Sequence, residues 1–198
     1  MSAGRKSVTS NKDWCTPKKY VDVIKKMWNG KIDLDPCSNI HSIVKANMEF
    51  MLPHQDGLGE DWGYGAVYVN PPYGNCKERG TSIRDWFKKI ANSYKKFDNE
   101  IIALVPVATN TSHWKKYVFP IASSICFLYD TRLKFIIDGT SDNKGAPMSC
   151  CMIYYGKNYM LFMETFAQYG AALPLYGIKY PSSEVDFEFN QIGLFEAV

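Results

Sequence analysis

Residues 66–73, with the sequence Ala-Val-Tyr-Val-Asn-Pro-Pro-Tyr, join a short apolar stretch to two consecutive prolines. The β-branched and aromatic residues of 66–70 predict a strand. Pro71 and Pro72 have no N–H group and hold φ at about −65°, so they end the strand abruptly. Each proline also disfavours helical backbone at the residue before it. We therefore expect a stiff, extended turn with free carbonyl groups at the carboxyl end of a strand.

Strands and helices are predicted to alternate on both sides of this turn. Further strands are predicted at 31–35, 101–106, 124–129, 132–137 and 149–155. Helices are predicted at 17–27, with Thr16 as N-cap and a stop at Asn29-Gly30, and at 82–96, 112–118 and 159–168. This alternation is typical of an α/β fold with a mostly parallel central sheet and flanking helices.

Polar residues stand at the predicted carboxyl ends of two strands. Asp33 and Asp35 end the strand at 31–35, and Asn70 ends the strand at 66–70. Ligands of open α/β sheets bind at the carboxyl ends of the strands. These three residues are therefore candidate ligand contacts.

The chain has 198 residues, with 46% hydrophobic and 22% charged residues, which is ordinary composition for one globular domain. We expect a flexible basic arm at 1–12, a single domain at 13–180 and a C-terminal tail at 181–198. No run approaches 18 apolar residues, so no membrane span is predicted. No Cys-x-x-Cys pair is present among the six cysteines, so we expect no metal site and interpret the cysteines as thiols of a cytoplasmic protein.

Positive charge is concentrated in two places, although the net charge is only +3. The first cluster lies within 1–30 and the second within 75–96, directly after the Asn-Pro-Pro-Tyr turn. Two basic clusters on a nearly neutral chain favour a surface that faces a polyanion. Solvated helix faces are the alternative explanation for either cluster.

The Asn-Pro-Pro-Tyr turn has the groups needed to hold a planar aromatic amine. The Asn70 side-chain carbonyl and the backbone carbonyls beside it are acceptors at fixed separation, and Tyr73 offers a ring face for stacking. Accepting both hydrogens of an adenine amine localises its nitrogen lone pair, so that the nitrogen can attack a sulfonium methyl group. Such catalysis depends on positioning and electrostatics. A proline-stiffened turn without catalytic function is the alternative.

The chain resembles the methyltransferases that act on adenine amines in DNA, whose hallmark is (Asp/Asn/Ser)-Pro-Pro-(Tyr/Phe/Trp). Within them it is similar to the small phage-type, Dam-like DNA N6-adenine methyltransferases. The elements of that group stand here in order as Trp14-Cys15-Thr16-Pro17, Asp33-Leu34-Asp35-Pro36-Cys37-Ser38-Asn39, Asp56-Gly57-Leu58, Asn70-Pro71-Pro72-Tyr73, Leu104-Val105-Pro106 and Gly145-Ala146-Pro147. The likeness runs from about Asp13 to Gly156.

The resemblance implies a Rossmann-like fold, S-adenosylmethionine as methyl donor and catalytic roles for Asn70, Pro71, Pro72 and Tyr73. It also implies a bacteriophage protein of the restriction-modification class, and it leaves the biological purpose open between evasion of host restriction and replication timing. We expect a monomer or weak dimer.

The resemblance also implies which residues contact the cofactor, and it does so with alternatives left open. Thr16 could instead cap a helix, one of the two early aspartates could merely cap a turn, and Asp56 could be a turn acid before Gly57. Asp35-Pro36-Cys37-Ser38-Asn39 replaces the usual glycine-rich first motif. The predicted cofactor contacts are Trp14, Thr16 and Pro17 near the methionine end, Asp33, Asp35 and Pro36 in the first motif, Asp56 at the adenine amine, and Asn70.

The expected substrate is double-stranded DNA, in which an adenine must leave the helix before its amine can react. The predicted DNA contacts are Lys77, Arg79, Arg84, Asn110, Lys115 and Lys116, with the loop from Asp130 to Gly145 as a further candidate. No insertion is long enough for a large recognition domain, so we expect a short target sequence or weak specificity. Two alternatives remain: a methyltransferase acting on RNA bases or protein glutamine, and a DNA-binding module without catalysis.

Overall fold

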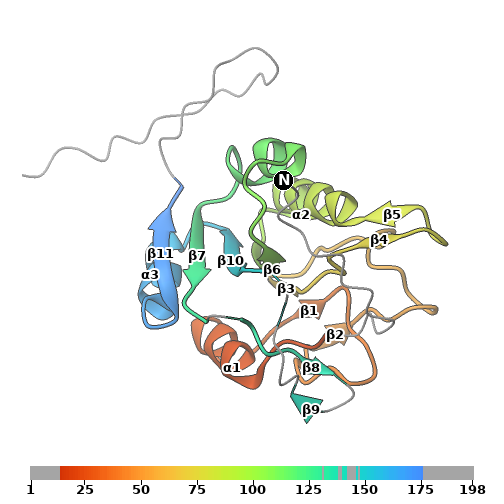
Figure 1. Ribbon diagram of the computed structural model, residues 1–198, viewed down its shortest axis with the longest axis horizontal. Coiled ribbons are helices and arrows are strands. Elements are labelled where there is room, and N and C mark those ends of the chain that lie inside the picture. The colour runs from red at the N-terminus through yellow and green to blue at the C-terminus, as the bar shows by residue number, and fades with distance from the viewer. Residues whose placement is uncertain (1–13, 131, 138–139, 142–145, 147, 176–198) are drawn as a thin grey trace, which may run out of the picture.

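The computed structural model describes residues 14–130, 132–137, 140–141, 146 and 148–175. The predicted arm at 1–12 and the predicted tail at 181–198 lie outside the described residues, as does much of the loop from Asp130 to Gly145. The described part of the chain forms a sheet with helices on both faces, so the predicted mixed α/β architecture is confirmed (Figure 1). In that part of the chain, no helix is long and apolar enough to cross a membrane.

The main sheet has seven strands among the described residues, in the order β11-β7-β10-β6-β3-β1-β2. Their bounds are β1 Leu34–Asp35, β2 Met48–Glu49, β3 Ala66–Val69, β6 Glu100–Pro106, β7 Ser124–Leu128, β10 Cys150–Tyr155 and β11 Gly170–Pro174. Strands β2, β1, β3 and β6 pair in parallel. Strand β10 is antiparallel to both β6 and β7, and β11 is antiparallel to β7.

The expectation of a mostly parallel sheet holds for strand direction but not for strand pairing. Within the described seven-stranded sheet, β10 and β11 run against the other five strands, and this makes three of its six pairings antiparallel. Parallel neighbours need a long crossover, usually a helix. The described residues between β7 and β10 contain no helix, and β10 accordingly returns antiparallel to β7.

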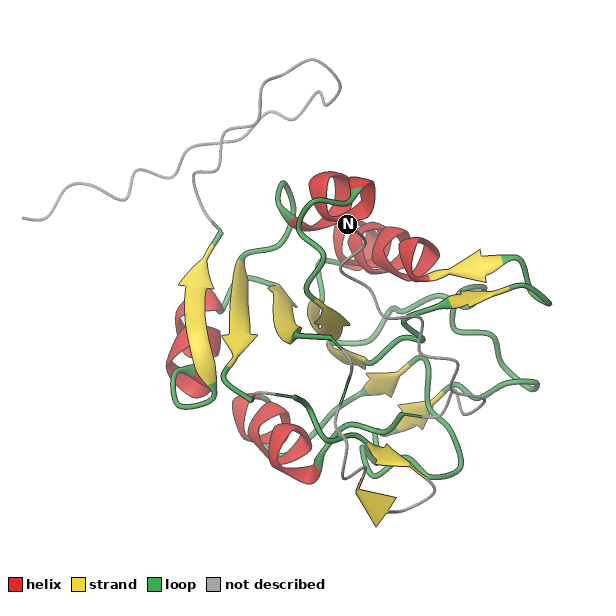
Figure 2. Cartoon of the chain, in the orientation of Figure 1, coloured by secondary structure: helices red, strands yellow, loops and turns green. Residues whose placement is uncertain are grey.

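Helices cover both faces of the sheet (Figure 2). Helices α1 (Lys18–Met27) and α3 (Tyr159–Phe166) contact each other and belong to one core cluster. Helix α2 (Ile83–Phe97) and the π-helix η1 (Trp114–Val118) belong to the other. Strand β6 contributes side chains to both clusters. Ile102 and Leu104 face the first cluster, and the alternate residues Ile101, Ala103 and Val105 face the second. A strand buried on both faces explains the continuous apolar run from which it was predicted.

The start of α1 differs from its prediction. The helix begins at Lys18, and Pro17 occupies the N-cap position without a side-chain cap hydrogen bond. Thr16 therefore does not cap the helix; its hydroxyl lies 2.6 Å from the Tyr68 hydroxyl, in the buried region between α1 and the sheet. The predicted end is confirmed, since Asn29 and Gly30 have φ of 52° and 87°.

Several short elements were missed or misjudged from sequence. The predicted strand at 132–137 is reduced to β8 (Ile136–Ile137), which pairs with β9 (Thr140–Ser141). Strands β2 and β11, and the hairpin of β4 (Asn75–Cys76) with β5 (Thr81–Ser82), were not predicted. The hairpin projects from the body of the molecule directly after the Asn-Pro-Pro-Tyr turn (Figure 1).

Candidate active site

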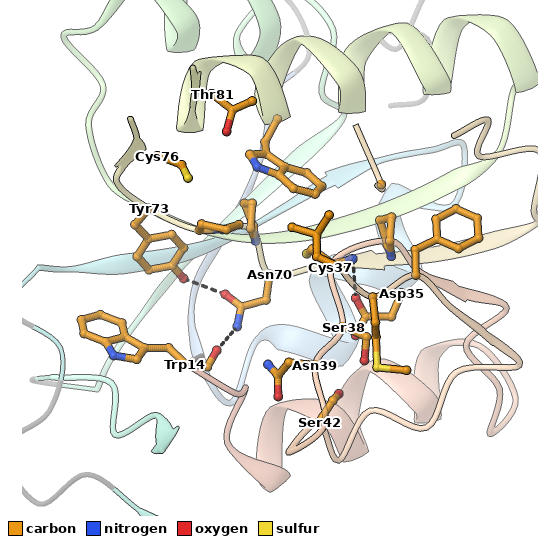
Figure 3. Close-up of a pocket in the computed structure, with 18 of the residues that line it drawn as sticks. Trp14, Asp35, Cys37, Ser38, Asn39, Ser42, Asn70, Tyr73, Cys76 and Thr81 are labelled. Carbon is orange, nitrogen blue, oxygen red and sulfur yellow. Dashed lines mark hydrogen bonds between the residues drawn. The ribbon is translucent and has the colours of Figure 1, made fainter. Parts of the chain in front are cut away.

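The carboxyl ends of β1, β2 and β3 open onto a cavity of about 870 Å³ (Figure 3). The residues that follow these strands, Pro36, Phe50 and Asn70, all line it. Ten of the residues predicted to act in catalysis or binding are in its wall: Trp14, Thr16, Asp35, Pro36, Asp56, Asn70, Pro71, Pro72, Tyr73 and Arg79. Tertiary folding thus brings the separate sequence elements to one place.

The Asn70 side chain is held at both ends of its amide. Its Nδ2 donates a hydrogen bond to the Trp14 main-chain carbonyl at 2.7 Å, and its Oδ1 lies 3.2 Å from the Tyr73 hydroxyl (Figure 3). The Tyr73 hydroxyl also lies 3.2 Å from the Leu104 carbonyl, so its one hydrogen is shared between two acceptors. An amide oxygen has two lone pairs, which leaves Asn70 Oδ1 able to accept a further hydrogen bond.

Tyr73 packs in a cluster with two other aromatic rings. Its ring meets Trp14 edge to face at 6.3 Å and meets Phe135 in the same way at 5.9 Å. Trp14 stacks on Phe135 at 5.1 Å with an interplanar angle of 27°. Burial raises the pKa of Tyr73 well above its ordinary value, and nearby Cys150 adds to the effect. The hydroxyl is therefore a neutral donor at physiological pH.

The two candidate aspartates of the first motif have different surroundings. Asp35 is only 4% exposed, lines the cavity and accepts a hydrogen bond from the Cys37 N–H at 3.1 Å. Asp33 does not line the cavity: its carboxylate accepts from the Ala66 N–H at 3.0 Å and from the Asn47 amide at 3.1 Å. Of the two, Asp35 is the one placed to meet a ligand, while Asp33 ties its neighbouring segments together.

Burial raises the pKa of Asp35 to about 7. The Cys37 N–H opposes this shift by stabilising the carboxylate, and Glu49, its register partner on β2, adds to it by repulsion. The Cys37 thiol also lies in the cavity wall, and burial raises its pKa well above the usual range, with the Asp35 charge adding to the effect. Asp35 therefore changes charge near neutral pH inside the cavity.

Asp56 forms a salt bridge with Arg79 at 2.5 Å, and both side chains line the cavity. Its other carboxylate oxygen accepts from the Leu58 N–H at 3.0 Å, so it also shapes the turn before Gly57. Partial burial is the largest single influence and would raise the pKa of Asp56, but the hydrogen bonds from Arg79 and the Leu58 N–H, together with the positive charge of Arg79, outweigh it, so the pKa is lowered. Asp56 thus stabilises the turn before Gly57, as one alternative from the sequence proposed, and it also lines the cavity.

Gly57 allows this loop to approach the first motif closely. A Cβ atom at this position would lie 1.8 Å from the Pro36 carbonyl oxygen. Only glycine can make this approach without a shift of the backbone. Pro36 and Asp56, both predicted to contact a cofactor, are held in one wall by that contact.

The other predicted binding residues lie outside the cavity wall. Pro17 precedes α1, and Arg84 lies at the start of α2. Burial lowers the pKa of His113 below its usual value, and the nearby positive charge of Arg84 lowers it further. Lys77 lies between β4 and β5, and Asn110 follows β6. All of the predicted DNA contacts except Arg79 are exposed: Lys77, Arg84, Asn110, Lys115 and Lys116.

Some cavity residues were given no binding role in the sequence analysis, although two of them, Ser38 and Asn39, belong to the first motif. Ser38, Asn39 and Ser42 follow β1 and line the cavity. Among the described residues, Ser38 Oγ, Glu49 Oε1 and Trp14 Nε1 are buried without a hydrogen-bond partner. The rule that ligands bind at the carboxyl ends of strands could have found Ser38, because it stands three residues after Asp35.

Within the same described ranges, no group of three or more His, Cys, Asp or Glu could hold a metal ion.

Comparison with known families gives one match. The family described as DNA N-6-adenine-methyltransferase (Dam) matches residues 4–170. Comparisons with curated proteins and with solved structures give no match. The matched residues include the whole wall of the cavity.

Proposed function

The chain belongs to the DNA N-6-adenine-methyltransferase (Dam) family, and we propose that it transfers a methyl group from S-adenosylmethionine to the N6 amine of an adenine flipped out of DNA. One observation carries the proposal: the Asn70 amide stands at the carboxyl end of β3 in the cavity wall, with Oδ1 able to accept a further hydrogen bond. The carbonyl of Pro71, a residue with no N–H of its own, is the second acceptor.

The topology supports a Rossmann-like methyltransferase fold. Strand β1 has β2 on one side and β3 on the other, so the strand order reverses there. Ligands of open α/β sheets bind in the crevice at such a switch point, outside the carboxyl ends of the strands. The cavity lies at this place.

The lining of the cavity near β1 fits S-adenosylmethionine in its chemistry. The cofactor presents an ammonium, two ribose hydroxyls and an adenine amine, all of which are donors. The wall offers the Asp35 and Asp56 carboxylates, and the buried hydroxyl of Ser38 has no partner among the described residues. Asp35 and Ser38 would hold the polar middle of the cofactor, and Asp56 its adenine amine. When bound, the cofactor supplies an electrophilic methyl group on a sulfonium.

At the other end of the cavity, Asn70 Oδ1 and the Pro71 carbonyl accept the two hydrogens of the adenine amine. Both acceptors are neutral, so they hold the amine without protonating it. Their fixed geometry favours a nitrogen with a localised lone pair, and this positioning is the main catalytic contribution. Tyr73 provides the ring against which the adenine stacks. As the nitrogen bonds to the methyl carbon, the carbon–sulfur bond would break and its electron pair would stay on the departing thioether; the methylated amine would then release its proton to solvent.

Exposed basic residues support a DNA substrate. Arg84 near the start of α2 and the two lysines of η1 lie on packed neighbouring elements, and Lys77 lies in the projecting hairpin. Such residues position a duplex through its phosphates. A short target sequence, a monomeric or weakly dimeric state and a role in phage restriction-modification remain predictions.

The test is methylation of unmethylated duplex DNA with labelled S-adenosylmethionine, followed by digestion to nucleosides. We expect label in N6-methyladenine for the wild type and for Asn92→Ala, a control at an exposed asparagine on α2, but not for Asn70→Ala. Label in RNA or protein instead would redirect the substrate assignment. No label from a folded protein that binds DNA would identify a non-catalytic DNA-binding module.

A further inference from the structure

The orientation of the Asn70 amide is decided by a single main-chain carbonyl. The Trp14 carbonyl can only accept, and it lies 2.7 Å from Asn70 Nδ2. A flipped amide would place two acceptor oxygens against each other at that distance. Nδ2 must therefore face Trp14, which leaves Oδ1 to face Tyr73 and the cavity.

The Trp14 carbonyl is held by contacts to a segment far along the chain. The Trp14 indole stacks on buried Phe135. The next residue, Cys15, exchanges two backbone hydrogen bonds with Ile136, both at 2.9 Å. Phe135 and Ile136, at the start of β8, thus hold the backbone of residues 14 and 15.

The Trp14 side chain acts here through its ring and not through its N–H. Within the described part of the chain, Nε1 is buried without a hydrogen-bond partner. Its contacts are the stack on Phe135 and the edge contact with Tyr73. A phenylalanine ring would keep such contacts, whereas an alanine would lose them.

We propose that Trp14 is a positioning residue for the methyl transfer. Its stack on Phe135 holds the main-chain carbonyl that orients the Asn70 amide, and Asn70 in turn holds the substrate amine. This rests on the proposed function. It differs from a cofactor contact, because a positioning role predicts a loss in kcat with little change in cofactor affinity.

The kinetic test compares Trp14→Ala, Trp14→Phe and Phe135→Leu. A misplacement of about 1 Å can lower the rate ~100-fold. We expect Trp14→Ala and Phe135→Leu to lower kcat ~10- to 100-fold, with the Kd for S-adenosylhomocysteine within about twofold of wild type. Trp14→Phe should recover most of the rate. The double variant Trp14→Ala/Phe135→Leu should be no slower than the slower single variant, because both changes release the same carbonyl.

Trp28→Ala is the matched control. Trp28 is also half-buried, but its indole N–H donates to Glu100 at 2.7 Å and it does not line the cavity. This variant should lose stability while its kcat stays near wild type. A weaker Kd for S-adenosylhomocysteine with unchanged kcat in Trp14→Ala would overturn the proposal, and so would equal losses of kcat in the Trp14 and Trp28 variants.

A second readout needs no activity. The Asn70 side-chain amide protons are assigned by NMR from their loss in Asn70→Asp. In the wild type and in Trp14→Phe they should exchange slowly with water, because one is bonded to the Trp14 carbonyl; in Phe135→Leu they should exchange faster. Unchanged exchange in Phe135→Leu would refute the positioning role. If the wild type makes no N6-methyladenine, the proposed function fails, but this experiment still decides how Asn70 is held.

Discussion

Arg79 and Asp56 are joined by a salt bridge of 2.5 Å that connects the β4–β5 hairpin to the loop packed on Pro36. The two residues are predicted to contact different ligands, since Asp56 is expected to bind the cofactor and Arg79 to bind DNA. The bridge therefore connects the two proposed binding sites.

The first prediction concerns Arg79→Gln. Loss of the guanidinium should lower DNA affinity and reduce the salt dependence of binding by about one unit of slope. It should also change the Kd for S-adenosylhomocysteine, because Asp56 loses the partner that lowers its pKa. Arg84→Gln, in which the changed arginine is exposed and outside the cavity, should change only DNA binding. Titration calorimetry with each ligand measures both effects, and identical cofactor affinity in the two variants would contradict the coupling.

The second prediction concerns Asn70→Asp. An aspartate keeps an acceptor for the substrate amine, but it has no donor for the Trp14 carbonyl 2.7 Å away. An ionised carboxylate would also face that carbonyl oxygen, which is a second acceptor. We expect kcat to fall at least ~10-fold, because a misplaced acceptor loses its positioning effect. Steady-state kinetics on duplex DNA measure it, and a wild-type kcat would show that the Trp14 hydrogen bond is dispensable.

The third prediction concerns the effect of pH on cofactor binding. The pKa of Asp35 is raised to about 7, so its carboxylate becomes charged as the pH rises through 7. If the charged form holds donors of the cofactor, affinity for S-adenosylhomocysteine should increase from pH 6 to pH 8. The variant Asp35→Asn should bind more weakly at pH 8 and show a flatter profile. A profile of the same steepness in both proteins would exclude Asp35 as the titrating group.

The same group gives a fourth prediction, on stability without ligand. The folded-state pKa of Asp35 lies above its unfolded value, so the native state binds more protons than the unfolded state between the two pKa values. The free energy of unfolding therefore falls as the pH rises from about 4 to 7. Asp35→Asn removes this loss. Its melting temperature should exceed that of the wild type at pH 8 by at least ~2–4 °C, the shift that about 1 kcal/mol produces in a chain of this size. The difference should shrink at pH 5, and calorimetry at both values decides it.

The fifth prediction concerns Gly57. An added Cβ would lie 1.8 Å from the Pro36 carbonyl oxygen, so Gly57→Ala must displace the loop or the first motif. Overpacking of this kind costs about 1–3 kcal/mol. We expect a lower melting temperature and a weaker Kd for S-adenosylhomocysteine. Gly59→Ala is the control, because its nearest contact would be an ordinary 3.5 Å to the Asp56 carbonyl. Equal effects in the two variants would argue against the close approach.

Local features of the sequence determined much of the fold. The prolines after Val69 end β3, the apolar run of β6 marks a strand buried on both faces, and Asn29-Gly30 ends α1. Proline geometry, side-chain periodicity and the tolerance of positive φ all act within a few residues, so they can be read without knowing the rest of the chain. The motif at the end of β3 was found for the same reason.

Tertiary structure decided which of these residues meet, and how. Asp33 and Asp35 look alike in sequence, yet only Asp35 lines the cavity. Thr16 suits a helix cap, yet its hydroxyl meets Tyr68. The hydrogen bond from Asn70 to Trp14 joins residues 56 positions apart, and the stack of Trp14 on Phe135 spans a longer separation still. Such contacts depend on how strands and loops from distant parts of the chain are packed together, and no local pattern of residues encodes that packing.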